Sequence, residues 1–367
     1  MKGKDLLSWC LGLLAAAVLG GCLALAARGL AVGRGAATGT AVDTSARQEA
    51  APLSWPQKAG REAPGYGTDL AQNLPCSGAL PLEPQPGEPV AVGLALPLDM
   101  DPGGYRAALL DSRGRVLSRA AFFSLGNEAG AEFRALAAVL AVPSTAMTGP
   151  ATIRVEPAVE GLGDISIMIG ERSFVAEEIY LDQRNTEIRT VPDPQKTAES
   201  EQLTAILYTT GAEVYTWEAW LPPVAATRRT SFYGDRRVYR YSTGGSATSI
   251  HAGVDYGVPT GTEVRSSAAG KVVLAQFRIS TGNSVVIEHL PGVYSIYYHM
   301  DSIAAQEGAM VEAGELLGLS GATGLATGPH LHWEIRVSGE NADPDAFTQR
   351  PVLDKTAIFR ILRKSLD

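Results

Sequence analysis

The sequence predicts a mainly β protein with an N-terminal immunoglobulin-like β-sandwich, a mixed connector with a helix, and a C-terminal domain built on an antiparallel β-sheet. Forty Gly and 22 Pro among 367 residues, with only 7% aromatic residues, favour short strands joined by turns over long helices. Short apolar runs recur between turn signals such as the Asp-Pro-Gly-Gly sequence at 101–104. At about 100–200 residues per domain, the length indicates two or three domains.

Composition excludes two classes of protein. The net charge of −8 is opposite to the basic character of nucleic-acid-binding proteins, so no nucleic-acid partner is expected. The three cysteines are Cys10, Cys22 and Cys76, and the first two lie in an apolar N-terminal stretch. The one cysteine that remains cannot form a disulfide framework, which excludes a disulfide-stapled protein.

Residues 1–27 are predicted to be an export segment, because residues 6–27 carry no charge. Three interpretations remain open. The stretch is long enough for an uncleaved anchor, which needs about 20 apolar residues, and the Ala-Leu-Ala tripeptide at 24–26 fits a cleaved signal peptide. The Leu-Gly-Gly-Cys sequence at 19–22 resembles a bacterial lipobox with Cys22 as the lipidated residue. Each interpretation places the rest of the chain outside the cytoplasm, and we expect it in the cell envelope, facing the periplasm or wall.

Residues 28–80, rich in Gly, Ala, Pro, Ser and Thr, are predicted to form a flexible tether. Residues 81–173 then carry strand-like runs separated by turns, the pattern of an immunoglobulin-like β-sandwich. These runs are 89–96, 105–110, 120–125, 151–155 and 165–169. This segment contains no histidine, so we expect it to be a spacer or binding module.

Residues 174–228 are predicted to be a connector between two domains. Within it, Asp193 and Pro194 precede a helical pattern at 196–208, with an apolar stripe at Leu203, Ile206 and Leu207. Strand and turn patterns return over 229–350. Residues 351–367 are predicted to form a short amphipathic C-terminal helix.

All five histidines fall within one window of 82 residues, from 251 to 332. His330 and His332 alternate with apolar residues on a predicted strand, so their side chains share one face. They are either a metal ligand with a neighbouring acid/base group or a pair of surface histidines. His251 and Asp255 likewise share a face of an extended segment. A neutral imidazole and a carboxylate are good zinc ligands, and with His332 they make three, which leaves the fourth tetrahedral position open as in catalytic zinc sites.

The remaining candidates admit structural interpretations. His299 ends a strand-like run at 293–299 and either lies across the site from His330 or is a buried core histidine. His289 is expected to make structural hydrogen bonds at a strand end. Glu334 shares the face of His330 and His332, where it either orients an imidazole or pairs with an arginine.

Several motifs then occur in the order found in one family. Residues 230–347 closely resemble the LytM/lysostaphin-type zinc metallopeptidases, which cut peptide bonds in bacterial peptidoglycan. The motifs are Ser-Phe-Tyr-Gly-Asp-Arg at 231–236, His-Ala-Gly-Val-Asp at 251–255, Gly-Ala-Thr-Gly at 321–324, Thr-Gly-Pro-His-Leu-His at 327–332 and Asp-Pro at 343–344. The resemblance implies one Zn²⁺ per domain, with His251, Asp255 and His332 as ligands and His299 and His330 as catalytic histidines.

The resemblance further implies a metalloendopeptidase that hydrolyses peptide crosslinks of peptidoglycan with a zinc-activated water. Its partners would be the stem peptides of the wall and, through the N-terminal anchor or lipid, a membrane. We expect His330 to accept the proton of the water and His299 to hold the developing oxyanion, although the reverse division is also open. The alternatives are a non-catalytic or autoinhibited regulator that binds wall or activates an amidase, and a peptidase that acts on proteins.

Overall fold

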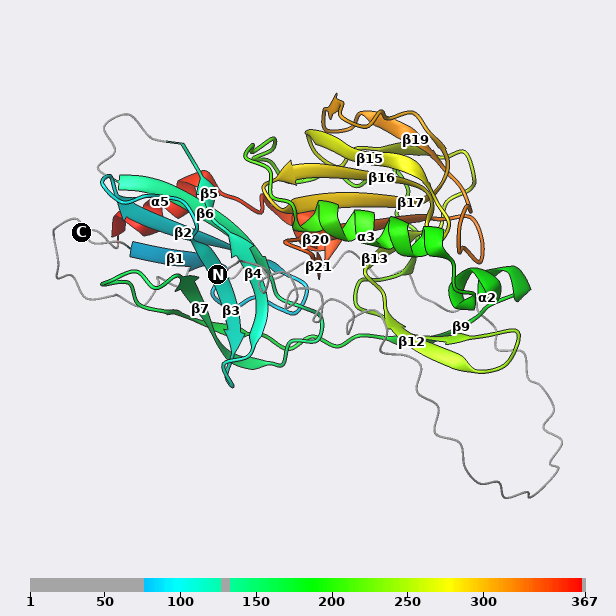
Figure 1. Ribbon diagram of the computed structural model, residues 1–367, viewed down its shortest axis with the longest axis horizontal. Helices are drawn as coiled ribbons and strands as arrows, with labels where there is room; N and C mark the ends of the chain where they lie inside the picture. Colours follow the sequence, from blue (N-terminus) through cyan, green and yellow to red (C-terminus); the bar gives the residue numbers. More distant parts are fainter. Residues whose placement is uncertain (1–75, 127–132, 365–367) are drawn as a thin grey trace, which may run out of the picture. The chain divides into compact units, whose positions relative to one another are not determined.

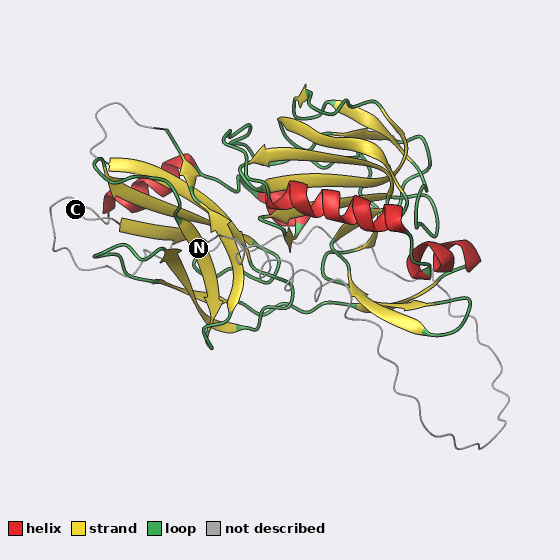
Figure 2. Ribbon diagram, in the orientation of Figure 1, coloured by secondary structure: helices red, strands yellow, loops and turns green. Residues whose placement is uncertain are grey.

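The computed structural model describes residues 76–126 and 133–364. The predicted export segment, Cys22 and most of the predicted tether therefore lie outside the described residues. Within these two ranges, no helix has the length and apolar character that a membrane span requires. Strands predominate over helices in the described chain, which confirms the prediction of a mainly β fold (Figure 2).

The N-terminal part is a sandwich of two four-stranded antiparallel sheets, with strand orders β1-β2-β6-β5 and β4-β3-β7-β8. Alternate side chains of the two sheets meet in a core rich in alanine, valine and isoleucine. The immunoglobulin-like topology stays a prediction. The strands are β1 Cys76–Leu80, β2 Pro89–Pro97, β3 Arg106–Asp111, β4 Val116–Ala121, β5 Phe123–Ser124, β6 Phe133–Ala141, β7 Gly149–Glu156 and β8 Ile165–Ile169.

Helix α5 (Lys355–Lys364), at the C-terminal end of the described chain, packs on β1 and β2 of the sandwich. Gly78 and Gly93 are directly paired between these strands. A Cβ at Gly93 would lie 2.8 Å from Cγ2 of Ile358, and one at Gly78 would lie 2.1 Å from Cγ2 of Ile361, so only glycine admits the helix at this distance. Because α5 covers the second face of the sheet, β2 is buried on both faces and its sequence is continuously apolar.

The connector contains more regular structure than the single helix predicted from the sequence. Strand β9 (Ala176–Tyr180) is followed by helix α2 (Gln183–Thr190) and helix α3 (Pro194–Tyr208). The side chain of Asp193 accepts hydrogen bonds from the first turn of α3, and Pro194 occupies its first position, as the sequence indicates. Figure 1 shows α3 along one face of the sheet at β16 and β17, where Leu207 packs in a small apolar cluster.

The C-terminal part is built on a ten-stranded sheet with the main order β10-β13-β20-β17-β16-β15-β18, to which β14, β19 and β21 are added. Trp333, Ile335 and Phe347 are among the fully buried side chains of its core. The elements are β10 Arg229–Ser231, β13 Gly253–Tyr256, β14 Glu263–Arg265, β15 Gly270–Arg278, β16 Gly282–Leu290, β17 Val293–Ile303, β18 Met310–Val311, β19 Leu316–Ser320, β20 Leu331–Val337, β21 Glu340–Ala342 and α4 Pro344–Gln349.

A separate three-stranded sheet has the order β12-β11-β9, with β11 at Arg236–Arg240 and β12 at Ser246–Ile250. Strand β9 pairs in parallel with β11, so a strand of the predicted connector belongs to a sheet of the C-terminal part. Two further differences from the sequence analysis concern boundaries. Strand β1 occupies the last five residues of the predicted tether, and the strand that was expected to close at His299 continues to Ile303.

Candidate metal centre

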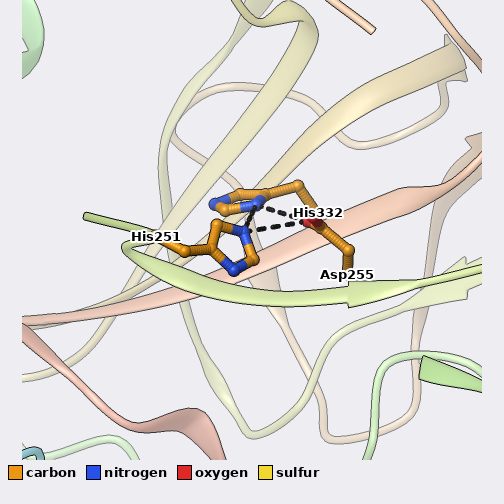
Figure 3. A group of neighbouring side chains, drawn as sticks. All are labelled: His251, Asp255 and His332. Atoms are coloured by element: carbon orange, nitrogen blue, oxygen red, sulfur yellow. Dashed lines mark hydrogen bonds and ion pairs between the residues drawn. The ribbon is translucent and has the colours of Figure 1, made fainter. Parts of the chain in front are cut away.

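The side chains of His251, Asp255 and His332 converge on one point (Figure 3). Nε2 of His251 lies 3.1 Å from Oδ1 of Asp255 and 3.0 Å from Nδ1 of His332. The same Asp255 oxygen lies 2.8 Å from Nδ1 of His332. All three residues are buried. Two imidazole nitrogens and one carboxylate oxygen are a ligand set that Zn²⁺ prefers.

Strand pairing brings these residues together. In the antiparallel pair β13 and β20, Asp255 is directly opposite His332, and cross-strand neighbours on one face of a sheet lie within contact distance. His251 precedes β13 and exchanges backbone hydrogen bonds with Gly234 and Asp235. Gly253 is required between His251 and Asp255 because a Cβ there would lie 2.1 Å from the carbonyl oxygen of Trp333.

The ring nitrogens of His251 and His332 that face away from the shared point are hydrogen-bonded to neighbouring residues. Nδ1–H of His251 donates to the carbonyl oxygen of Phe232 at 2.8 Å, and Nε2–H of His332 donates to the Glu334 carboxylate at 3.2 Å. These bonds leave Nε2 of His251 and Nδ1 of His332 directed at the shared point, next to Oδ1 of Asp255, where each can offer a lone pair once its ring is neutral. The donor set and its outer hydrogen bonds therefore fit a zinc ion.

Charge at the centre also favours a cation. Burial favours the neutral form of His332, but hydrogen bonds to Asp255 and Glu334 outweigh it and raise its pKa to about 9. Burial disfavours the charged form of Asp255 too, yet the adjacent His251 and His332 hold the pKa of its carboxyl well below the usual range. Burial lowers the pKa of His251. In the metal-free chain the Asp255 carboxylate is thus balanced by a proton on His332, which a bound cation would displace, whereas His251 stays neutral.

His299 and His330 border this trio. Their ring centroids lie 4.7 Å apart, and the ring of His299 lies 6.3 Å from that of His332. His299 has a φ of 61°, a conformation that is uncommon for residues other than glycine and often marks functional sites. Nδ1–H of His299 donates to Thr323 O, and Nδ1–H of His330 donates to Gly328 O, both at 2.8 Å. Because Nδ1 of each ring donates to a carbonyl, Nε2 is the nitrogen that is left to accept a proton.

Comparison with known proteins identifies the segment that holds this centre. The sequence model of peptidase family M23 matches residues 249–344. These residues are a peptidase family M23 domain. The three converging residues, His251, Asp255 and His332, and the two bordering histidines, His299 and His330, all fall inside the M23 domain.

Relatives of the M23 domain include named peptidoglycan enzymes. DD-carboxypeptidase/endopeptidase Mpg of Neisseria meningitidis is 38% identical over 124 residues, which cover 34% of this chain and 28% of that protein. Peptidoglycan DD-endopeptidase ShyB of Vibrio cholerae is 40% identical over 93 residues, 25% of this chain and 22% of that protein. The match thus spans about a quarter of each relative.

Among solved structures, the catalytic domain of the antimicrobial peptidase lysostaphin from Staphylococcus simulans is 28% identical. The alignment covers 33% of this chain and 92% of that domain, with a TM-score of 0.28.

The structure also shows the contacts of the other residues considered in the sequence analysis. Glu334 does both things considered for it, because it accepts a hydrogen bond from His332 and pairs with Arg336. His289 is fully buried and bonds Ala269 O and the Ser295 hydroxyl, which matches the structural role expected of it. Sequence reasoning missed Arg237, which donates to the second carboxylate oxygen of Asp255 at 2.7 Å.

Proposed function

We propose that this chain is a zinc-dependent metalloendopeptidase that hydrolyses peptide crosslinks of bacterial peptidoglycan. The observation that carries the proposal is the convergence of His251 Nε2, Asp255 Oδ1 and His332 Nδ1 beside two further histidines. Three protein ligands leave a coordination position for water, which distinguishes catalytic from structural zinc sites. The substrate class is supported by the names of the relatives of the M23 domain.

The chain's own residues supply proton transfer. A bound Zn²⁺ would lower the pKa of a water ligand toward about 7 and polarise the scissile carbonyl. We assign proton acceptance to Nε2 of His330, because Nδ1 of this ring already donates to Gly328 O and Nε2 lies 3.9 Å from Oδ1 of Asp255, next to the metal position. The same ring can then donate this proton to the leaving amine.

His299 has a different character. Burial, together with the neighbouring His330 and His332, lowers the pKa of His299 to about 3, so its ring stays neutral. A neutral ring that already donates from Nδ1 offers an acceptor at Nε2, whereas an oxyanion requires a donor. These contacts weigh against the expected oxyanion role. We propose instead that Nε2 of His299 accepts a hydrogen bond from the attacking water and orients it.

The proposed substrate requires a location in the cell envelope, facing the periplasm or wall. We propose that the export segment at 1–27 delivers the chain there, with attachment to the membrane by that segment or by a lipid on Cys22. Radiolabelled fatty acid incorporated by the wild type but not by Cys22→Ser would support the lipid. Membrane association retained in Cys22→Ser without such labelling would favour the protein anchor.

The proposal is tested by mass spectrometry of muropeptides released from purified sacculi by the full-length chain. We expect crosslinked dimers to decrease in favour of monomers, with activity lost in chelator, restored by Zn²⁺ and lost in His330→Ala. Unchanged crosslinks with zinc bound would contradict the proposal. Digestion of a denatured protein without any change in sacculi would instead favour a peptidase acting on proteins.

One observation favours the autoinhibited alternative. Helix α2 lies against two loops, the first of which borders the centre: Asn185 Nδ2 donates to Ala326 O at 3.1 Å, and the Thr186 hydroxyl accepts from Ser242 N, in the turn between β11 and β12, at 3.1 Å. Asn185 and Thr186 are both buried. The first loop also carries the carbonyl groups that hold His299 and His330. A helix bridging these loops can restrict entry of a peptide.

The alternative makes its own prediction. If α2 restricts entry, Asn185→Ala with Thr186→Ala raises the rate of sacculus hydrolysis and leaves zinc content unchanged. Arg184→Ala, on the exposed side of the same helix, serves as the matched control. A rate that falls or stays level in the double variant would exclude autoinhibition by α2.

A further inference from the structure

The two oxygens of Asp255 have separate partners. Oδ1 faces His251 and His332 at the shared point, at 3.1 and 2.8 Å. Oδ2 accepts a hydrogen bond from Nη2 of Arg237 at 2.7 Å. The side chains of Arg237 and Asp255 are 12% and 9% exposed, so this is a buried, charge-assisted contact. Arg237 therefore determines which oxygen of Asp255 is directed at the metal position.

Arg237 is itself held from its other side. Its Nε donates to Oε1 of Glu177 at 2.7 Å, and the two residues are direct neighbours in the parallel pair of β11 and β9. The Glu177 carboxylate also accepts the Ser231 hydroxyl at 3.0 Å. Because Nε and Nη2 of the guanidinium are each engaged by a different carboxylate, its orientation is fixed in the folded chain. The charges alternate from Glu177 through Arg237 to Asp255.

We propose that Arg237, braced by Glu177, is a positioning residue of the metal centre and keeps Asp255 a one-oxygen ligand. With Oδ2 occupied by the guanidinium, only Oδ1 is available to a zinc ion, and this proposal rests on the zinc site proposed above. A two-oxygen carboxylate would fill the position that water or the substrate carbonyl must take. Both residues precede 249, so the unit that builds the centre extends beyond the segment matched to family M23.

The same two strands provide a matched control. Arg240 of β11 pairs with Glu178 of β9, in a second arginine–glutamate contact between the same elements. Its side chains are 43% and 44% exposed, and exposed ion pairs contribute little to stability. Arg240→Gln thus removes an arginine of the same strand and the same kind of ion pair without touching Asp255.

The test measures metal binding by the purified full-length chain. Zinc affinity is determined by competition with a chromophoric chelator for the wild type and for Arg237→Gln, Arg237→Lys, Glu177→Gln and Arg240→Gln. We expect a loss of about 10–100-fold for Arg237→Gln, the range found when a residue that orients a metal ligand is replaced. The loss should be smaller for Arg237→Lys and Glu177→Gln, and absent for Arg240→Gln.

Visible absorption of the Co²⁺-substituted protein provides a readout that a purely structural role would not change. Tetrahedral Co²⁺ absorbs more strongly than five-coordinate Co²⁺, so release of Oδ2 in Arg237→Gln should weaken the band. Melting of the metal-free variants separates positioning from folding, because a positioning residue lowers metal affinity even where the metal-free melting temperature is kept.

Each outcome decides between the two proposals. Wild-type chain that binds no zinc would overturn the proposed function itself. Wild-type binding with equal affinity and unchanged Co²⁺ spectra in Arg237→Gln and Arg240→Gln would overturn the positioning role alone. A further result would also overturn the positioning role. In it, metal-free Arg237→Gln does not fold, which accounts for its reduced affinity, whereas Arg237→Lys folds and keeps the wild-type affinity and Co²⁺ spectrum.

Discussion

Protonation of His289 should destabilise the fold, and the structure allows the size of the effect to be worked out. The ring is fully buried in β16, where Nδ1–H donates to Ala269 O at 2.8 Å and Nε2 faces the Ser295 hydroxyl at 2.7 Å. The Trp220 ring packs against it with centroids 4.4 Å apart. None of these three contacts of the ring is with a carboxylate that could balance a positive charge.

Burial lowers the pKa of His289 from 6.5 to about 4, partly offset by its hydrogen bond to the Ala269 carbonyl. The folded protein therefore favours the neutral ring. The contribution of this residue to stability is complete above pH 6.5 and decreases as the pH falls from 6.5 toward 4. At about 1.4 kcal/mol per pKa unit, the full loss is roughly 3 kcal/mol.

The assay is urea unfolding between pH 7.5 and 4 in the presence of chelator, so that release of metal does not contribute. His289→Gln is the comparison because its amide can donate to the same carbonyl and does not titrate in this range. We expect the free energy of unfolding of the wild type to fall by about 3 kcal/mol more than that of the variant. Parallel pH dependence in the two proteins would refute the argument.

Further predictions concern the metal centre and the C-terminal helix. His332→Ala should lose zinc on dialysis because only two ligands remain, and metal retained at the wild-type level would contradict the ligand assignment. His330→Ala should keep zinc while sacculus hydrolysis slows by about 10²–10⁴-fold, and an unchanged rate would remove it from proton transfer. Leu362→Ala should lower the free energy of unfolding by about 2–5 kcal/mol, measured in urea, because Leu362 is fully buried. Gly93→Ala should also destabilise, since its Cβ would lie 2.8 Å from Ile358, and an unchanged melting temperature would argue against this packing of α5.

The three residues proposed as metal ligands could be brought together from the sequence because their arrangement depends on short-range geometry. His251 and Asp255 belong to one extended segment, and His332 lies on a strand whose pairing with β13 places it opposite Asp255. The two-residue period of strands also placed Glu334 on the face of His332, where it now holds the ring. The helix at α3 was predictable for the same reason, since its cap and apolar stripe are local signals.

Features that depend on distant pairing could not be predicted in the same way. Arg237 and Glu177 are 60 positions apart, and their contact arises only from the parallel pairing of β9 with β11. Strand β9 alternates in burial but is short and half polar, so it carries little strand signal. Helix α2 has one apolar residue, Ile188, and therefore shows no apolar stripe. Gly78 and Gly93, which lie under α5, indicate turns or bulges when the sequence is considered alone, because the helix that packs on them is distant in the chain.

The motif residues and the residues that hydrogen-bond to them have different roles in the centre. The motif residues supply the atoms that converge, whereas the direction of each atom is set by a hydrogen bond with a neighbour: His251 donates to Phe232 O, His332 donates to Glu334, and Asp255 accepts from Arg237. Only Glu334 lies within the matched M23 segment. A sequence motif therefore identifies which side chains can bind a metal, but the folded chain upstream of residue 249 decides how two of the three are oriented. This is why we expect substitutions at Arg237 to change metal affinity before they change the fold.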